Sequence, residues 1–480
     1  MINKKNILVI IFSSIIFGGI FFYTFLKKEE KINTNFSFKS EFVQKYAENI
    51  KPTSSSALPH KRIIFLTLES IRHDHLHFME YFRHTTDFSD HLLKNSILFE
   101  NMYTPIPYTS PSHSSMFTSL YPTDTNMYIN SDVLSGEYYT LAEYLKGLDY
   151  KTAAFTGAYT LASSNLEQGF DRYEKVIPER MILDWDDWQL NHRDIYTSLD
   201  LFDDWFKDIK ENDNFFVWIH INDTHNRMLN IAPDYVANSD DVLVKKGDIL
   251  DFYKSEHYLN FEFSPFLLYS SFDELNSKKK TELLWDVTSR YDGAIQLVDN
   301  EISKLYKQFE ERDFLEESLW IIVPDHGEGF GQHDFGGHGE NVFEEQIRTP
   351  LIMHSPSMTK GHKPPYLAEN VDILPTIAEI VGFDLTDEYE IDGESLLKYI
   401  REGKGKDYVF SMTPTNKAYS IQNEKYKYIY HDKEIIEWGE VVNKDMFFDL
   451  ENDPYEQNNI IGTMPKIENE MKELILERAI

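Results

Sequence analysis

The sequence predicts an α/β protein with a large, mostly parallel sheet between helices on both faces. Three apolar runs of strand length have the continuous hydrophobic character of strands covered on both sides, namely Arg62–Leu68, Phe215–Ile219 and Leu319–Val323. Segments with helical periodicity separate these runs along the chain. Strands that alternate with helices are typical of parallel sheets, because each helix carries the chain back to the end of the sheet where the previous strand began.

Further elements fill the intervals between these strands. We expect a helix over Leu141–Leu148, a strand over Lys151–Phe155 and a second helix from about Ile195 to Ile209. From Leu283 to about Glu311 the apolar residues recur at helical spacing, which predicts a long amphipathic helix. Residues 227–280 have no clear period, and we interpret them as an insertion that could shape a pocket.

The N-terminal stretch from Ile7 to Leu26 contains no charged residue and has a pair of lysines on each side. Its twenty residues, at about 1.5 Å each, match the roughly 30 Å hydrocarbon core of a bilayer. The run is longer than a usual signal-peptide core, and no small-x-small cleavage site follows it. We therefore predict an uncleaved signal anchor (1–28) and a polar stalk (29–60), with the single-pass protein's folded body outside the cytoplasm.

Composition excludes several classes of function. The formal net charge of −33 argues against nucleic-acid binding, because a phosphate backbone would be repelled. The absence of cysteine rules out disulfides, thiolate metal sites and a cysteine nucleophile. A hydrophobic content of 41% is sufficient for a core in a chain of 480 residues. No feature of the sequence indicates an oligomeric state.

Ionisable side chains gather where the three predicted strands end. Ligands bind at the carboxyl ends of strands in open α/β sheets. The acidic and histidine side chains at these ends are Glu69, then Asp223 and His225 after His220, then Asp325, His326 and His338. Carboxylates and imidazoles together favour Mn or Zn, and the glycines of the third loop let the backbone approach closely. A helix cap at Glu69, or a polar loop that happens to contain histidines, is the competing interpretation.

A hydroxyl-rich stretch, Thr109-Ser-Pro-Ser-His113, precedes an apolar helical patch. It offers a nucleophile at a helix start, where outward-facing backbone N–H groups would favour an anion. Ser and Thr before an apolar run are equally typical of an ordinary N-cap. Both interpretations stay open on these residues alone.

Taken in order, these motifs resemble the sulfatase-like family of the alkaline phosphatase superfamily, over a span from about Arg62 to Asn458. The early motifs are Ile63 to Leu76, Thr109 to His113 with Phe117 to Pro122, Leu141 to Gly157, Gly169 to Asp171 and Asp223-Thr-His225. The later motifs are Tyr291-Asp292, Val298-Asp299, Asp325 to His338-Gly339, Arg348 to Ile352, Val371 to Thr376, Asp392-Gly393 and Phe448 to Pro454.

The resemblance implies an alkaline-phosphatase-like sandwich, with a catalytic domain over 61–404 and a small C-terminal α+β subdomain over 405–480. It also implies metal-dependent attack on an anionic phosphate, phosphonate or sulfate ester. By position, the residues around a divalent ion would be Glu69, Thr109, Asp325 and His326, with Thr109 as the covalent nucleophile. His225 and His338 would contact the substrate's oxygens or protonate the leaving group.

Three departures separate this chain from the sulfatase pattern. Sulfatases oxidise a cysteine or serine to an aldehyde at the position of Thr109, and threonine cannot form that aldehyde. His113 stands where the family has arginine, and Glu69-Ser70 replaces the usual paired aspartates. The chain is therefore similar to the threonine-nucleophile members, and this donor set favours Mn or Zn over Ca or Mg. A second ion, held by Asp223, His225 and His338, is possible, but we favour a site with a single divalent ion.

These features lead to a primary functional hypothesis and three alternatives. The primary one is a membrane-anchored, metal-dependent hydrolase of phosphate-type or sulfate esters. The first alternative is a transferase that passes a phosphoryl group to a cell-envelope acceptor. The second is a true sulfatase that works without the aldehyde. The third is an inactive binding scaffold, which the complete set of competent residues argues against.

Overall fold

The computed structural model describes residues 60–176, 192–225 and 277–479, apart from short gaps at 331–332, 334–335, 357–360, 415–416, 433–435, 438–439 and 442–443. All of these residues belong to one compact unit, residues 50–480. The predicted anchor lies outside the described residues, as do nearly all of the stalk and most of the predicted insertion. Within the described ranges, no helix combines the length and apolar character needed to cross a membrane. The anchor stays a prediction.

A seven-stranded sheet in the order β2-β10-β7-β1-β6-β4-β5 forms the centre of this unit. The strands from β7 to β5 are parallel to their neighbours, whereas β10 is antiparallel to both β7 and β2. The sheet is therefore mixed, with its antiparallel pairings at one edge. Its strands are β1 (Arg62–Leu68), β2 (Ser96–Phe99), β4 (Lys151–Thr156), β5 (Arg172–Glu174), β6 (Phe215–Ile221), β7 (Ser318–Pro324) and β10 (Leu351–His354).

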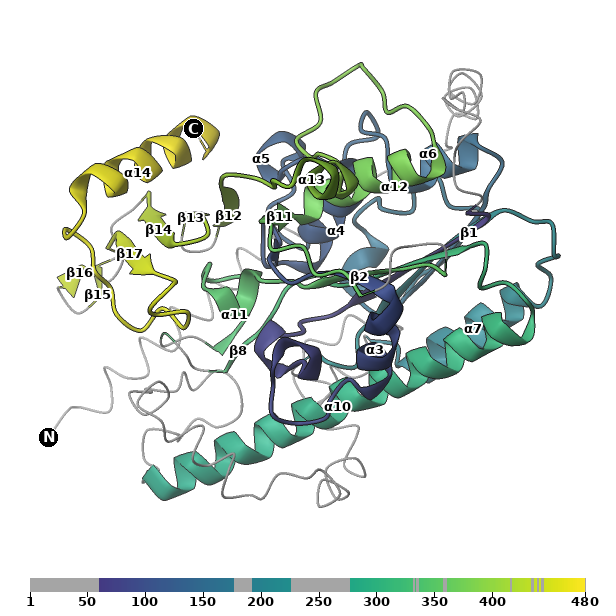
Figure 1. Cartoon of the computed structure of the whole chain (residues 1–480), viewed down its shortest axis with the longest axis horizontal. Helices are drawn as coiled ribbons and strands as arrows, with labels where there is room; N and C mark the ends of the chain where they lie inside the picture. The colour runs from purple at the N-terminus through teal and green to yellow at the C-terminus, as the bar shows by residue number, and fades with distance from the viewer. Residues whose placement is uncertain are drawn as a thin grey trace, which may run out of the picture. The chain divides into compact units, whose positions relative to one another are not determined.

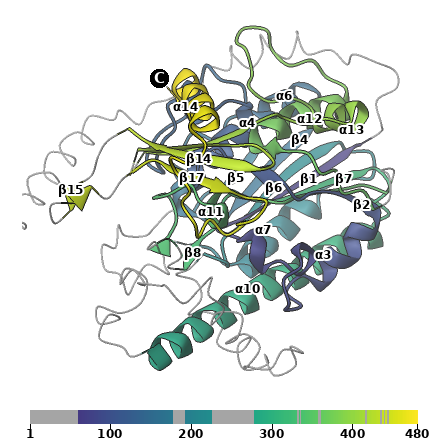
Figure 2. The same cartoon turned by 60° about the vertical axis from the view of Figure 1, so that its left-hand side comes forward.

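Helices cover both faces of this sheet. Helices α3, α7 and α10 lie on one face and α4, α6, α12 and α13 on the other (Figures 1 and 2). Helix α10 begins at Ser277, so it includes the end of the segment predicted as an insertion. The helices are α3 (Asp87–Leu92), α4 (Thr109–Thr118), α5 (Pro122–Thr125), α6 (Leu141–Gly147), α7 (Ile195–Phe206), α10 (Ser277–Glu311), α11 (Glu344–Ile347), α12 (Ile373–Val381), α13 (Leu396–Glu402) and α14 (Pro465–Ala479).

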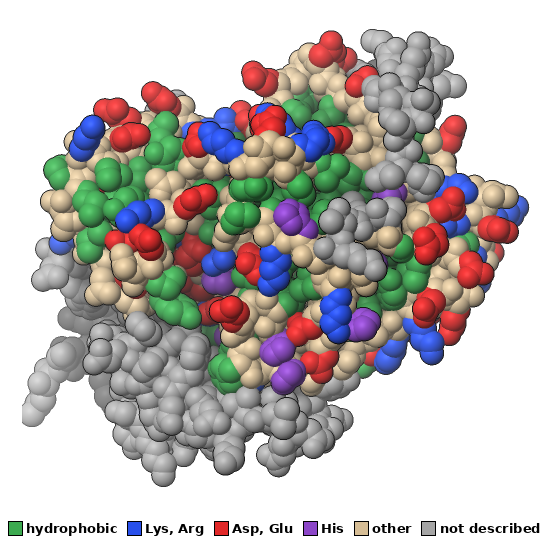
Figure 3. Space-filling view, in the orientation of Figure 1, with side chains coloured by type: hydrophobic (Ala, Val, Ile, Leu, Met, Phe, Trp, Pro, Cys, Tyr) green, Lys and Arg blue, Asp and Glu red, His purple; other side chains and the backbone are tan. Residues whose placement is uncertain are grey.

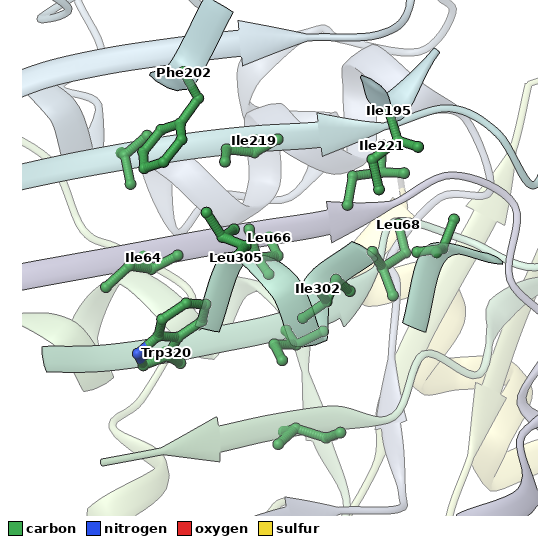
Figure 4. Close-up of a cluster of buried hydrophobic side chains, with 14 of the residues drawn as sticks. Ile64, Leu66, Leu68, Ile195, Phe202, Ile219, Ile221, Ile302, Leu305 and Trp320 are labelled. Atoms are coloured by element: carbon green, nitrogen blue, oxygen red, sulfur yellow. The ribbon is translucent and has the colours of Figure 1, made fainter. Parts of the chain in front are cut away.

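The main core lies between the central sheet and the two helices α7 and α10. Every residue of β1, β6 and β7 is buried, as their continuous apolar runs predict. Figure 4 shows side chains of β1, such as Leu66, beside Leu305 of α10, with Phe202 of α7 in the same cluster. Burying each such side chain stabilises the fold by roughly 1.5–3 kcal/mol. This packing holds the ends of the three strands in fixed positions.

A second, antiparallel sheet of four strands lies toward the C-terminus, in the order β12-β13-β14-β17. Helix α14 packs on it through Met471 and Ile475, which cluster with Ile421 and Tyr428. These strands are β12 (Val409–Thr413), β13 (Ala418–Gln422), β14 (Tyr426–His431) and β17 (Met446–Asp449). The domain boundary expected at residues 404 and 405 stays a prediction. Short pairs complete the fold: β3 (Met102–Tyr103) with β11 (Ala368–Glu369), β8 (Gly329–Phe330) with β9 (Gly336–Gly337), and β15 (Ile436–Glu437) with β16 (Glu440–Val441).

Acidic and basic side chains are interspersed on the face shown in Figure 3. The sequence as a whole has 80 acidic residues against 47 basic ones. A surface of this kind attracts no polyanion over long range, so the recognition of an anionic substrate has to come from a local site. Such a site lies at the carboxyl end of the central strands.

Candidate active site

Strands β1 and β7 bring two carboxylates to one edge of the sheet. Leu68 lies opposite Pro324 in the parallel register of β1 and β7. Glu69 and Asp325 are the next residues after these two strands, so the register itself places them as neighbours. Both are buried. Because parallel strands share a carboxyl end, the sequence could predict this pair from the two apolar runs alone.

Helix α4 adds Thr109 to the same edge. The Ser112 hydroxyl donates to the backbone carbonyl of Asp325 at 2.7 Å and so ties the first turn to the end of β7. The N-cap is Tyr108, whose side chain makes no capping hydrogen bond. Thr109 Oγ1 donates instead to Glu69 Oε1 at 3.3 Å. The Thr109 hydroxyl is therefore directed at a carboxylate and does not cap the helix.

The backbone N–H groups of this helix start are mostly occupied. Ser110 N–H donates to Asn130 Oδ1 at 2.9 Å, and Ser112 N–H donates to the Tyr108 carbonyl at 2.9 Å. Pro111 has no N–H to offer. Ser110, Pro111 and Ser112 therefore present no unoccupied N–H to an anion in this structure, and the expected anion site at the helix start stays a prediction. The positive end of the helix dipole is the contribution that remains.

Glu69, Asp325 and His326 form one compact cluster of possible ligands. His326 Nε2 lies 3.2 Å from Glu69 Oε1 and 3.7 Å from Asp325 Oδ2. One ligand atom from each of the three residues lies within 4.8 Å of the others. The structure thus brings together the four residues that the family resemblance implies as metal ligands, the fourth being Thr109.

Burial and mutual interaction shift the pKa values in this cluster. Burial alone would raise the pKa of Glu69, but hydrogen bonds with His220 and His326 hold it well below its usual range. Burial and the charge of Glu69 raise the pKa of Asp325 to about 6. Burial opposes a charge on His326, yet the Asp325 and Glu69 carboxylates raise its pKa to about 9. Two carboxylates this close require positive charge between them.

The cluster fits a divalent metal ion. Asp325 Oδ2 and His326 Nε2 are buried and make no hydrogen bond within the described part of the chain. His326 Nδ1 lies 2.9 Å from the Gly327 carbonyl and donates to it, so loss of the Nε2 proton would leave a lone pair directed at the cluster. Carboxylate oxygens with an imidazole nitrogen match the ligands of Mn or Zn. The preference for Mn or Zn stays a prediction.

His338 and His225 lie beside this cluster. The ring centroids of His326 and His338 are 4.3 Å apart, and those of His225 and His338 are 5.2 Å apart. His338 Nδ1 is 3.3 Å from Glu328 Oε2, which leaves its Nε2 available toward a substrate. Both histidines are only partly buried, so a ligand from solvent can reach them.

The predicted second metal set is placed differently by the structure. Glu69, His225 and His338 have ligand atoms within 4.8 Å of one another, whereas Asp223 does not belong to this group. Burial and the charge of Asp194 raise the pKa of Asp223 to about 7. A second ion at His225 and His338 would therefore share Glu69 with the first.

From the sequence alone, no role is assigned to His220, which is noted only at the end of the second strand, or to His113. His220 Nε2 lies 3.0 Å from Glu69 Oε2, and His113 Nδ1 donates to the Thr109 carbonyl at 2.7 Å. Both imidazoles meet at the hydroxyl of Thr67. A histidine inside an otherwise apolar strand resembles an ordinary core residue, and the one available signal was its polarity in a run with no other polar residue.

A family model described as sulfatase matches residues 61–383, about two thirds of the chain. The chain belongs to the sulfatase family. A second model, described as N-sulphoglucosamine sulphohydrolase, C-terminal, matches residues 336–479. The family assignment within the alkaline phosphatase superfamily, inferred from the motifs, is confirmed, and the chain is a sulfatase-like hydrolase.

Relatives of this sulfatase-family chain cover most of its length. An ulvan-active sulfatase of Formosa agariphila is 24% identical over 417 residues, which is 80% of this chain and 74% of the relative. A protein solved in complex with its substrate D-glucosamine-2-N,6-O-disulfate has a TM-score of 0.65 and 18% identity, covering 89% of this chain and 97% of its own. The phosphonate monoester hydrolase of Agrobacterium radiobacter has a TM-score of 0.64 and 16% identity, covering 89% and 96%. At these identities the two solved structures show a shared fold.

Proposed function

We propose that this sulfatase-family protein is a metal-dependent hydrolase of anionic phosphate-type esters and that Thr109 is its covalent nucleophile. The observation that carries the proposal is the hydrogen bond from Thr109 Oγ1 to Glu69 Oε1, 3.3 Å long, beside Asp325 and His326. Threonine has no route to the sulfatase aldehyde. The hydroxyl itself is then the group available for attack.

Each side chain has a role that follows from its contacts. Glu69, Asp325 and His326 would hold the ion, which when bound supplies the positive charge that activates a hydroxyl and offsets developing negative charge. Glu69 orients Thr109 Oγ1 through their hydrogen bond. His338, which is hydrogen-bonded to Glu328, would contact a substrate oxygen. His225, next to His338, would donate a proton to the departing alkoxide.

A sulfate ester is the second candidate substrate. The sulfatase family model and the ulvan-active relative favour it. Sulfate and phosphonate monoesters both present a tetrahedral centre with negative oxygens, so the same cluster can accept either. We further propose that the anchor predicted at residues 1–28 places this chemistry outside the cytoplasm, where an acceptor alcohol could compete with water for the transferred group.

The test is a panel of chromogenic esters assayed with the full-length protein and with Thr109→Ala. The panel contains a phosphomonoester, a phosphodiester, a phosphonate monoester and a sulfate. We expect a phosphate-type ester to be the best substrate and Thr109→Ala to lower kcat by about 10⁴-fold or more, since it removes the nucleophile.

The neighbouring hydroxyl supplies the matched control. Ser110 Oγ donates to the Thr160 carbonyl at 3.1 Å, so Ser110→Ala should keep most of the activity. Full activity in Thr109→Ala would overturn the nucleophile assignment. Sulfate as the best substrate, with activity lost in Thr109→Ala, would keep the nucleophile and replace the substrate class.

A further inference from the structure

We propose that His220 is a further ligand of the metal ion, through Nε2, and that the Thr67 hydroxyl sets its tautomer. The proposal rests on the metal-dependent function above and adds a residue to its site. His220 is fully buried on β6, and its Nε2 lies 3.0 Å from Glu69 Oε2. The ring is therefore directed at the carboxylate oxygen of Glu69 that does not face His326.

The hydroxyl of Thr67 has three nitrogen partners. Trp218 Nε1 lies 2.9 Å from Thr67 Oγ1, His220 Nδ1 3.0 Å and His113 Nε2 2.8 Å. An indole N–H can only donate, so Trp218 fills one of the two acceptor sites of the hydroxyl. One of the two imidazoles must then donate to Thr67, and the other must accept its single proton.

His113 decides which imidazole accepts. Its Nδ1 is 2.7 Å from the Thr109 carbonyl, which can only accept, so Nδ1 carries a proton. His113 is fully buried and both of its ring nitrogens have uncharged hydrogen-bond partners, so the ring is neutral and its Nε2 is bare. Thr67 therefore donates to His113 Nε2. His220 Nδ1–H must donate to Thr67.

The same proton assignment leaves His220 Nε2 as a lone pair facing a carboxylate. Two acceptors 3.0 Å apart repel each other unless a cation lies between them, either a proton or a metal ion. Asp325 also belongs here, because one ligand atom from each of His113, His220 and Asp325 lies within 4.8 Å of the others. A divalent ion at this point would satisfy His220 and both carboxylates.

His326 provides an internal comparison. Its Nδ1 is fixed by the Gly327 carbonyl and its Nε2 faces Glu69 Oε1, while His220 Nδ1 is fixed by Thr67 and its Nε2 faces Glu69 Oε2. Each oxygen of Glu69 thus has one imidazole nitrogen beside it. A donor set of two imidazoles and two carboxylates fits Zn or Mn far better than Ca, whose ligands are mainly oxygen.

The test measures metal affinity directly. Metal-free full-length protein is titrated with Zn²⁺ and with Mn²⁺ by calorimetry, for the wild type, His220→Asn, Thr67→Val and Asp325→Asn. Asparagine keeps a donor near the position of Nδ1 but has nothing at the position of Nε2. We expect His220→Asn to weaken binding by about 100-fold or more, beyond the roughly 10-fold expected for Thr67→Val, which removes only an outer partner.

His354→Asn is the matched control. His354 is also buried in a strand of the same sheet, between Ser96 and Tyr306 at 3.0 Å each, and far from the cluster along β10. The His354→Asn variant should bind Zn²⁺ and Mn²⁺ with the same affinity as the wild type. Unchanged affinity in His220→Asn, with affinity lost in Asp325→Asn, would overturn the role of His220 and leave the proposed function standing. Unchanged affinity in both would overturn the metal centre itself.

A second measurement does not depend on how His220→Asn folds. In the His225→Ala/His338→Ala variant loaded with one zinc per chain, X-ray absorption should show two imidazole ligands, which are His220 and His326. One imidazole would contradict the proposal. Metal-dependent thermal stabilisation of the same variant confirms that the ion is bound to folded protein.

Discussion

At the scale of single residues, Glu69 is the centre of the site. One oxygen of its carboxylate is near Ser70 Oγ, Thr109 Oγ1 and His326 Nε2, and the other is near His220 Nε2. The sequence predicts Glu69 because it directly follows a buried strand. It does not predict a role for His220, because a histidine within a continuous apolar strand can be either a metal ligand or an ordinary core residue.

The protonation of this cluster makes metal binding depend on pH. The pKa of Asp325 is raised to about 6 and that of His326 to about 9, so at neutral pH without a metal the proton at a ligand position is the one on His326, and Asp325 gains its proton only in acid. The ion has to displace these protons. We expect Zn²⁺ affinity to rise as the pH rises from about 6 to about 9, and to fall in acid.

Calorimetry in two buffers of different ionisation enthalpy measures the protons released. Asp325→Asn removes the carboxylate that raises the pKa of His326, so metal binding near neutral pH should release fewer protons. Metal binding without net proton release near neutral pH would contradict the assigned protonation states.

At the scale of elements, the loop after β7 and the start of α4 position each other. Gly339 has a φ of +86°, and a Cβ at this position would lie 2.4 Å from the Tyr108 ring. Tyr108 precedes Thr109, and Gly339 follows His338. The contact therefore links the nucleophile to a proposed substrate ligand.

Gly339→Ala should consequently impair both stability and catalysis. The substitution forces the Tyr108 ring to move in addition to straining the backbone. Gly462→Ala is the control, because Gly462 has the same φ of +86° with nothing within 4 Å. It should cost about 1 kcal/mol of unfolding free energy and leave kcat unchanged. Thermal unfolding and kcat for both variants measure the difference, and equal effects would show that the Tyr108 contact does not matter.

The elements differ in how far the sequence predicts them. The long buried strands β1, β6 and β7 are predicted because seven consecutive buried residues leave a clear apolar run. Strands β2 and β10 have four residues each, too few for a pattern, and they create the antiparallel edge. The start of α10 is missed because its first residues, Ser277 to Lys280, are polar and show no apolar period.

At the scale of the whole molecule, a buried ion-pair network joins the C-terminal sheet to the catalytic body. Lys427 of β14 has no exposed side-chain surface, and its Nζ lies 2.7 Å from Glu456 and 3.4 Å from Glu344 of α11. Burial raises the pKa of Glu456 to about 7, even though Lys427 counteracts this shift. The sequence gives no sign of this network because its members are far apart in the chain.

Removing the cation should therefore destabilise the whole fold. Lys427→Met removes the buried cation that both carboxylates share, and we expect a loss of about 3–5 kcal/mol in unfolding free energy. Lys425→Met is the control, because Lys425 pairs with Glu451 in solvent and should change stability very little. Urea unfolding of both variants gives the comparison. A loss no larger in Lys427→Met than in the control would mean that the network contributes nothing.

A nucleophilic Thr109 becomes covalently modified during turnover. The most direct measurement is acid quenching of the full-length protein during reaction with its best ester, followed by mass spectrometry of the peptide that contains Thr109. We expect one added phosphoryl group, or a sulfuryl group with a sulfate ester, on Thr109, and its absence in Thr109→Ala. An unmodified Thr109 with the adduct on another residue, or normal turnover in Thr109→Ala, would contradict it.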